Sequence, residues 1–328
     1  MRVIRRSLLA TPANTEAMLL KARAFPVDVL MLDLEDGVPN EDGAKARARR
    51  LLGEAMAGAE PTAGARIVAR RSSEDGGRTE PAAAAAAPPF AAREIAIRVN
   101  GPRTKWFLED AAFVAGLRVP TVVLPMVEDA ADVVYAERTL SALGAPASLG
   151  LILLIETPAG VLNLPEMVKA SPRINGLIAG GLDYAMCTHS LSILPFGNSG
   201  GAGRHDDDLL YMRQRVLAVA RAHKLSAIDA MRPGLISDLD AFRADAAYAR
   251  WLGFDGVDFY HPAFIATAND VFTPSAEELA WAERVLGANG GGDNSAPASR
   301  KVDGRVVLPQ HVEIARRLKT LAADIARG

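Results

Sequence analysis

Short β-branched or leucine-rich runs alternate along the chain with longer stretches that carry the hydrophobic periodicity of helices. This alternation is typical of βαβ units and predicts a parallel sheet. The expected strands are Val3–Ala10, Val27–Asp33, Ile95–Asn100, Thr121–Pro125, Leu149–Glu156, Gly176–Gly181, Ser226–Asp229 and Gly256–Tyr260. Amphipathic segments such as Glu128–Leu143 and Leu209–His223 stand between them. Strands and crossover helices in about 260 residues match a closed α/β fold, the (β/α)8 TIM barrel.

An open, doubly wound sheet is the alternative fold for the same pattern. Many such sheets bind nucleotides through a Gly-rich turn after the first strand. No such fingerprint follows the first expected strand of this chain, which favours the closed barrel.

Two segments of biased composition divide the chain. Residues 57–90, rich in alanine and proline, are expected to form a low-complexity insertion in a barrel domain that spans 1–286. The glycine-rich residues 287–299 are expected to be a flexible linker. Residues 300–328 are expected to be a C-terminal helical lid, because Pro309 opens a segment with one apolar stripe. The stripe consists of Val312, Ala315, Leu318, Leu321 and Ile325.

Composition limits the classes of partner. The chain has 328 residues, is 49% hydrophobic and has a formal net charge of −2, which argues against nucleic acid as a partner. No apolar run is long enough to span a bilayer, and the N-terminal apolar stretch is too short for a signal peptide. The single cysteine, Cys187, excludes an intrachain disulfide framework and a cysteine-based zinc site. The expected location is the cytoplasm.

Polar side chains gather at the carboxyl ends of four expected strands, where the loops of a barrel form its catalytic mouth. An acid that ends a run as apolar as LGLILLI is costly to bury without a partner, and several acids at one mouth repel one another unless a cation lies among them. The residues are Asp33, Glu35 and Asp36 after the second strand, Arg98 and Asn100 at the third, Glu156 at the fifth, and Asp183 after the sixth.

Oxygen ligands without a cysteine or histidine cluster favour a hard cation, and Mg²⁺ typically takes one or two carboxylates. Glu156 and Asp183 are therefore the expected metal ligands. Each has a structural alternative. Glu156 could form a salt bridge with Arg98, and Asp183 could cap the N-terminus of a helix.

The remaining nucleophiles and bases are ambiguous. His261 follows the eighth strand in FYHPAF, but the neighbouring Pro262 indicates a turn-forming role equally well. Cys187 has no obvious catalytic partner, so a buried or incidental thiol is the favoured interpretation.

Ordered motifs over most of the chain resemble the citrate lyase β-subunit-like and malyl-CoA lyase group of the HpcH/HpaI aldolase/citrate lyase superfamily. The resemblance leaves out the segment near residues 57–90. The motifs are RRSLLATPAN, DVLMLDLEDGVPNEDGAKARAR, IRVNGPRTKWFLED, LPMVEDAADV, LIETPAGVLNLPEM, GLIAGGLDYA and GFDGVDFYHPAFIATANDVFTPSAEELAWA.

The resemblance implies a barrel with a C-terminal helical extension and Mg²⁺ on Glu156 and Asp183. It also implies that Arg98 binds the carbonyl or carboxylate of a 2-oxo acid. Glu35 and Asp36 would hold metal-bound water.

The resemblance further implies a coenzyme A contact for Arg6, which lies in the opening motif, and a substrate contact for Pro158. A solvent-exposed arginine is the alternative for Arg6. The family also implies a homo-oligomer, a trimer or hexamer, with an acyl-CoA thioester and a 2-oxo acid as small-molecule partners.

The chain departs from the family pattern at several positions. Val257 stands where lysine is usual, and Leu308 stands where a C-terminal acid usually serves as a proton carrier. Asp303 or His311 could replace that acid. Gly37 stands where alanine is usual, which is expected to be a trivial change.

Three functions remain open. The first is a Mg²⁺-dependent carbon–carbon lyase that cleaves or forms a 3-hydroxyacyl-CoA such as malyl-CoA, methylmalyl-CoA or citramalyl-CoA. The second is a thioester hydrolase, or an aldolase for a 2-oxo acid without coenzyme A, on the same metal site. The third is a non-catalytic subunit, although a pure scaffold has no need for an acidic cluster at the mouth.

Overall fold

The computed structural model of the chain describes residues 3–57, 90–117, 119–191, 207–231, 236–288 and 300–327. The predicted insertion at 57–90 lies outside these residues except for its two ends. Residues 289–299 of the predicted linker lie outside them as well, while Gly287 and Ala288 belong to a helix.

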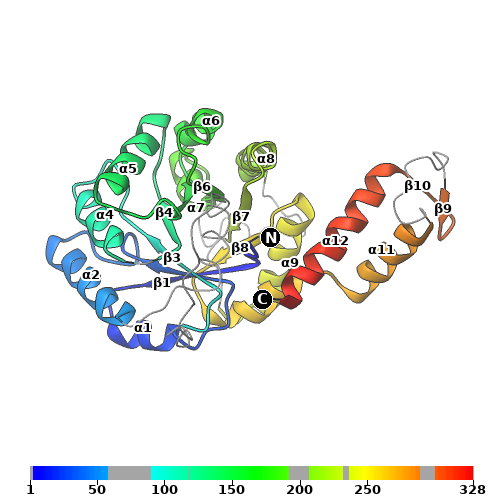
Figure 1. The fold of residues 1–328 in the computed structure, drawn as a ribbon, viewed down its shortest axis with the longest axis horizontal. Coiled ribbons are helices and arrows are strands. Elements are labelled where there is room, and N and C mark those ends of the chain that lie inside the picture. The colour runs from blue at the N-terminus through cyan, green and yellow to red at the C-terminus, as the bar shows by residue number, and fades with distance from the viewer. Residues whose placement is uncertain are drawn as a thin grey trace, which may run out of the picture.

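A closed barrel of parallel strands forms the centre of the molecule (Figure 1). The strands are adjacent in chain order, and the last pairs with the first, so the barrel prediction is confirmed and the open sheet is wrong. The strands are β1 (Ser7–Pro12), β2 (Val29–Asp33), β3 (Glu94–Arg98), β4 (Thr121–Leu124), β5 (Gly150–Ile155), β6 (Ile174–Ala179), β7 (Ser226–Ala230) and β8 (Gly256–Phe259).

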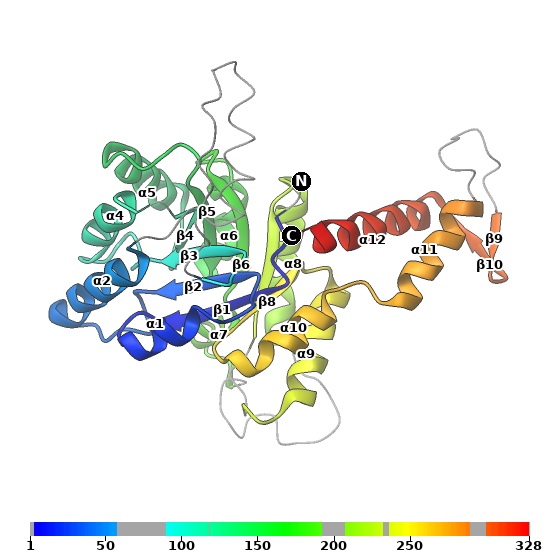
Figure 2. The same ribbon diagram turned by 60° about the horizontal axis from the view of Figure 1, so that its bottom comes forward.

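Helices surround the barrel (Figures 1 and 2). The main apolar core lies between these helices and the strands. A second apolar cluster fills the barrel interior. No helix in the described segments is long and apolar enough to cross a bilayer. The helices are α1 (Glu16–Ala22), α2 (Asp42–Met56), α4 (Phe107–Ala115), α5 (Ala130–Ala142), α6 (Pro158–Met167), α7 (Gly181–Cys187), α8 (Asp207–Ala222), α9 (Leu239–Leu252), η2 (Pro262–Phe264) and α10 (Ile265–Val271).

An ion pair closes the amino end of the barrel. Arg5 donates from Nε and Nη2 to the two carboxylate oxygens of Glu94, each at 2.8 Å, and from Nη1 to Ser226 Oγ at 2.7 Å. Thr121 Oγ1 also donates to Glu94. These contacts join the segment before β1 to β3, β4 and β7 at the amino end of the barrel, opposite the carboxyl end where the mouth lies.

An arm projects from the barrel, and Figures 1 and 2 show it extending to one side. It contains α11 (Ala276–Ala288), a hairpin of β9 (Arg300–Val302) and β10 (Arg305–Val307), and α12 (Pro309–Arg327). Ala282 and Val285 of α11 pack against Val312 and Ala315 of α12 in a separate apolar cluster. The predicted C-terminal helical extension is confirmed, and α11 packs with it. The predicted domain limits and the lid role remain predictions.

Candidate active site

Arg98 and Asp33 form a buried pair at the mouth. They end the neighbouring strands β3 and β2 at the same register position. Arg98 donates from Nε to Asp33 Oδ1 at 2.8 Å and from Nη2 to Asp33 Oδ2 at 2.7 Å. Its Nη1 lies 3.1 Å from Glu35 Oε2 and 3.2 Å from Asp36 Oδ2. Burial by itself would lower the pKa of Arg98, but these carboxylates raise it, so the guanidinium stays charged.

The loop after β2 is fixed by hydrogen bonds to its own backbone. Asp33 accepts hydrogen bonds from the amides of Glu35 at 2.8 Å and Gly37 at 2.7 Å. The buried Lys45 Nζ donates to the carbonyl oxygens of Leu34 at 2.9 Å and Glu35 at 2.8 Å. A Cβ at Gly37 would lie only 2.7 Å from Asp33 Oδ2, so the view that glycine for alanine is trivial here is wrong.

Glu156 directly follows β5 and is 3% exposed. Its Oε1 accepts a hydrogen bond from the Met126 amide at 2.8 Å. Met126 has a left-handed backbone conformation, with φ of 53°, which is unfavourable for a side chain of this kind and fits a backbone held for a function. Burial, and then the charge of Asp183, raise the pKa of Glu156 to about 8.

Asp183 lies in the first turn of α7, and its carboxyl group is hydrogen-bonded to that of Glu156. Burial and the charge of Asp36 raise the pKa of Asp183. The capping alternative is wrong, because the N-cap residue is Gly180, which makes no side-chain cap. The salt-bridge alternative is also wrong, because the ion pairs of Arg98 in the described residues go to Asp33, Glu35 and Asp36.

Gly180 leaves the space that Glu156 occupies. A Cβ at this position would lie 2.6 Å from Glu156 Cβ and 3.1 Å from its Oε2. Real Cβ atoms essentially never approach another atom as closely as 2.6 Å, so a larger residue would displace the carboxyl group. The backbone at the end of β6 therefore forms one wall around Glu156.

The donor set fits a hard divalent cation. Glu156 and Asp183 bring two oxygen-bearing groups together in a place where burial and mutual repulsion oppose their ionisation. A bound Mg²⁺ removes that conflict and typically needs only one or two carboxylates from the protein. Among the described residues, no group of three or more His, Cys, Asp or Glu side chains could hold a metal.

Other residues named from the sequence have structural partners. Asn100 donates from Nδ2 to Asp110 Oδ2 at 2.6 Å. Arg6 lies at the amino end of β1 and binds Asp28 through Nε and Nη2 at 2.8 and 2.9 Å. The structure therefore does not bring Arg6 to the mouth, and its coenzyme A contact remains a prediction. Pro158 is the first residue of α6, directly after the site, and its substrate contact also remains a prediction.

Three residues near the termini of elements have local roles. His261 Nδ1 accepts a hydrogen bond from the Ala263 amide at 3.2 Å, which supports the turn-forming interpretation. His311 Nδ1 accepts one from the Leu308 amide at 2.9 Å, and Asp303 pairs with Arg284 at 2.9 Å. Leu308 lies on the arm and is exposed. Cys187, at the end of α7, is also exposed.

Sequence reasoning assigned no role to Asp258. It lies on β8 and is 3% exposed. Burial raises its pKa, the charge of Arg98 lowers it and the charge of Asp33 raises it. The signal was present in the sequence, because an acid interrupts the otherwise apolar run GVDF at an inward position.

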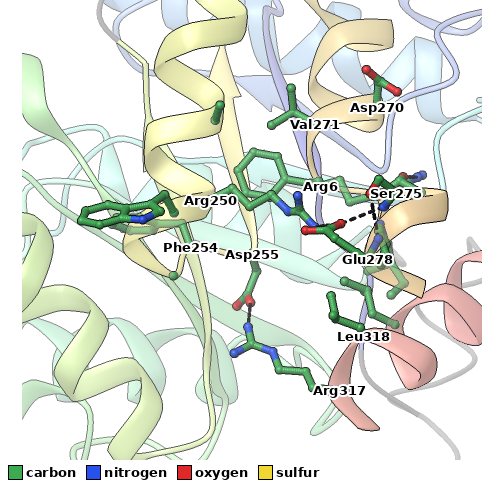
Figure 3. A pocket seen from close by; sticks show the side chains of 18 of the residues that line it. Arg6, Arg250, Phe254, Asp255, Asp270, Val271, Ser275, Glu278, Arg317 and Leu318 are labelled. Atoms are coloured by element: carbon green, nitrogen blue, oxygen red, sulfur yellow. Dashed lines mark hydrogen bonds and ion pairs between the residues drawn. The ribbon is translucent and has the colours of Figure 1, made fainter. Parts of the chain in front are cut away.

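A hollow of about 860 Å³ lies far from this mouth, between α12 and the amino end of the barrel (Figure 3). Its arginines are paired with acids, Arg250 with Glu278 at 2.8 Å and Arg317 with Asp255 at 3.6 Å.

A (β/α)8 barrel with carboxyl groups and an arginine at the carboxyl ends of its strands has the arrangement of a barrel enzyme. The model of the HpcH/HpaI aldolase/citrate lyase family matches residues 68–262, and the chain belongs to this family.

Two relatives extend the match to almost the whole chain. A (3S)-malyl-CoA thioesterase from Cereibacter sphaeroides is 29% identical, over 98% of this chain and 95% of the relative. An L-malyl-CoA/beta-methylmalyl-CoA lyase from the same species is 27% identical, over 97% and 96%. The solved structure of CitE from Mycobacterium tuberculosis, in complex with magnesium, acetoacetate and coenzyme A, aligns with a TM-score of 0.69. It is 24% identical and covers 98% of this chain and all of its own, and this likeness shows the fold.

Proposed function

We propose that the chain is a Mg²⁺-dependent lyase that cleaves a 3-hydroxyacyl-CoA of the malyl-CoA type into an acyl-CoA and a 2-oxo acid, or forms it in the reverse direction. The observation that carries the proposal is the buried carboxyl pair of Glu156 and Asp183 at a mouth that also holds Arg98. The names of the malyl-CoA relatives support the substrate class.

Glu156 and Asp183 are the proposed metal ligands. When bound, Mg²⁺ supplies a Lewis acid that polarises the oxygen on the carbon that becomes the 2-oxo group. Gly180 and the Met126 amide hold Glu156 in one position, so little reorganisation is needed when the metal binds.

Arg98 is the proposed contact for the substrate carboxylate. Asp33 fixes the plane of the guanidinium from one edge, and Nη1 on the other side faces Glu35 and the exposed Asp36. The 3.2 Å contact between Nη1 and the exposed Asp36 is the one that a substrate carboxylate would replace, which would release Asp36 from Arg98. Glu35 and Asp36 would hold a water molecule at the metal.

Thioester hydrolysis is the second candidate. It is favoured by the exposed Leu308 on the arm, which cannot carry a proton, and by the name of the 29%-identical relative. In that reaction water attacks the thioester carbonyl and the thiol of coenzyme A leaves, while the carbon–carbon bond stays intact.

The test incubates the purified protein with malyl-CoA and citramalyl-CoA, in Mg²⁺ and in chelator, and follows 2-oxo acid and free thiol in parallel. Metal-dependent release of a 2-oxo acid is the expected result. Release of free thiol without 2-oxo acid would mean that the protein is a hydrolase and not a lyase. If neither product forms, the result would favour a non-catalytic subunit.

The small-molecule partners follow from the same proposal. We expect an acyl-CoA thioester and a 2-oxo acid to bind at the mouth, and the chain to assemble as a homo-oligomer. Cytoplasmic location remains a prediction.

A further inference from the structure

Asp258 is an acid in an apolar layer of the barrel interior. Its register partners are Leu8 on β1 and Ala230 on β7, and both belong to or pack against the inner cluster. The flanking Val257 and Phe259 belong to the outer core, between barrel and helices. Since side chains alternate along a strand, Asp258 points into the barrel.

The Asp258 carboxyl lacks the compensation that other buried acids have. Asp28 and Glu94 each receive two hydrogen bonds from an arginine. Asp258 accepts one from the Phe259 backbone, while Oδ1 has no hydrogen-bond partner among the described residues. Burying a carboxyl with a single hydrogen bond costs free energy, so the contacts that Asp258 makes within the described residues do not account for it as a structural acid.

Asp258 lies directly below the mouth. Tyr260, two residues further along the chain, shares its inward direction and is half-exposed, and the register partner Ala230 is partly exposed. The charged groups that act on Asp258 are Arg98 from β3 and Asp33 from β2. Ala230 is small, so on the β7 side only a methyl group stands beside Asp258 at this level of the barrel.

We infer that Asp258 is the proton carrier of the site. This inference rests on the proposed lyase function. When the carbon–carbon bond breaks, its electron pair moves to the acyl-CoA fragment as an enolate. The O–H bond of Asp258 then breaks as a C–H bond forms at the α-carbon, and the positive charge of Arg98 favours the new carboxylate. In the condensation direction the same carboxylate removes that proton.

The acid–base properties of Asp258 suit this role. Burial raises its pKa to about 7, Arg98 partly offsets that rise, and Asp33 adds to it. Both protonation states are therefore populated near neutral pH, which favours proton transfer in either direction. Leu308, at the position where relatives are expected to have an acid, offers no proton.

The test is deuterium exchange at the α-carbon of acetyl-CoA. The intact protein is incubated in deuterium oxide with acetyl-CoA, Mg²⁺ and glyoxylate, and the label is measured by mass spectrometry. Wild type is expected to exchange with a pH profile centred near 7. Asp258→Asn is expected to lose about 100-fold or more, and its Tm should equal or exceed that of wild type because an unpaired carboxyl is gone.

Glu94→Gln is the matched control, since Glu94 is also a buried acid of the barrel but is paired with Arg5 at the opposite end. It should lower Tm and leave exchange per folded molecule unchanged. Should Asp258→Asn fail to fold, Asp258→Ser and the wild-type pH profile provide the same test.

Wild-type exchange in Asp258→Asn would overturn the inference and leave the lyase intact. A lower Tm with normal exchange would do the same and make Asp258 structural. A wild type that neither exchanges nor releases a 2-oxo acid would overturn the proposed function together with this inference.

Discussion

Glu156 is held out of water beside a second carboxyl group, which costs free energy whenever both are ionised. Its folded pKa of about 8 lies above the ordinary value of 4.5. A raised pKa contributes stability that is fully present below 4.5 and is lost as the pH rises through about 8. The metal-free protein should therefore lose stability across this range of pH.

We expect the Tm of wild type in chelator to fall between pH 4.5 and about 8, and the Tm of Glu156→Gln to fall less. Above that range the variant should be the more stable by several degrees. Thermal unfolding followed by circular dichroism provides the measurement. Identical pH profiles for the two proteins would mean that Glu156 is ionised at neutral pH without Mg²⁺.

Gly180→Ala tests the wall around Glu156. The new Cβ would lie 2.6 Å from Glu156 Cβ and 3.1 Å from its Oε2, so the Glu156 side chain must shift from its present position. We expect Mg²⁺ affinity to fall by about tenfold or more, which corresponds to about 1.4 kcal/mol, as measured by titration calorimetry.

Gly43→Ala is the matched control. This exposed glycine is the second residue of α2, and a Cβ there would have nothing within 4 Å. Alanine is the better helix former, so this variant should be at least as stable as wild type with unchanged Mg²⁺ binding. Equal Mg²⁺ affinity in both variants would remove Gly180 from the site.

At the scale of the elements, β1 depends on the ion pair at the closed end of the barrel. Arg5→Met would leave Glu94 buried without its cation, which typically costs about 3–5 kcal/mol. We expect urea unfolding to show a loss of that size. The double variant Arg5→Met/Glu94→Leu should recover part of it, because no buried charge remains.

Activity per folded molecule should stay unchanged in both Arg5 variants, since the pair lies at the opposite end from Glu156. A loss below about 1 kcal/mol in Arg5→Met would mean that water reaches Glu94. A selective loss of activity would connect the closed end of the barrel to the mouth.

The strand order confirms how the elements place the site. β2, β3, β5 and β6 deliver Asp33, Arg98, Glu156 and the turn before Asp183 to one rim. The βαβ pattern predicted this rim, because parallel strands end on the same side. The contacts within it could not be read from the pattern, since Arg98 is paired with Asp33 rather than with Glu156.

For the whole molecule, the arm is the distinctive feature. Its apolar cluster is separate from the two barrel clusters, and Val306, Leu308 and Ile314 are exposed on it. Exposed apolar side chains on a projecting arm are suited to contacts between copies of the chain.

We therefore expect the full chain to be a homo-oligomer and a chain that ends after Pro274 to be a monomer with a folded barrel. Light scattering after size-exclusion chromatography measures the mass, and circular dichroism checks the barrel. An unchanged number of subunits would place the interface on the barrel, and an unfolded truncated chain would make the arm part of the barrel fold.

The sequence by itself determined the barrel and the acids at the mouth, but not the strand ends: β1 ends at Pro12 rather than Ala10, β3 at Arg98 rather than Asn100, and β6 at Ala179 rather than Gly181. Hydrophobic periodicity is a local property, so it locates a strand, whereas the ends depend on where pairing with the neighbouring strands begins and stops. The alternation also contained the signal for Asp258, because an acid stands at an inward position of an apolar strand.

Only the tertiary structure decided which polar groups are partners. Arg6 is paired with Asp28, whereas Asp258 Oδ1 has no partner among the described residues, and both are charged residues on strands or strand ends. The free energy of a buried charge depends on groups brought near it by strands distant in sequence. A pattern along the chain does not contain those distances. The contacts of Asp33, Gly180 and Asp258 could therefore be identified only from the three-dimensional structure.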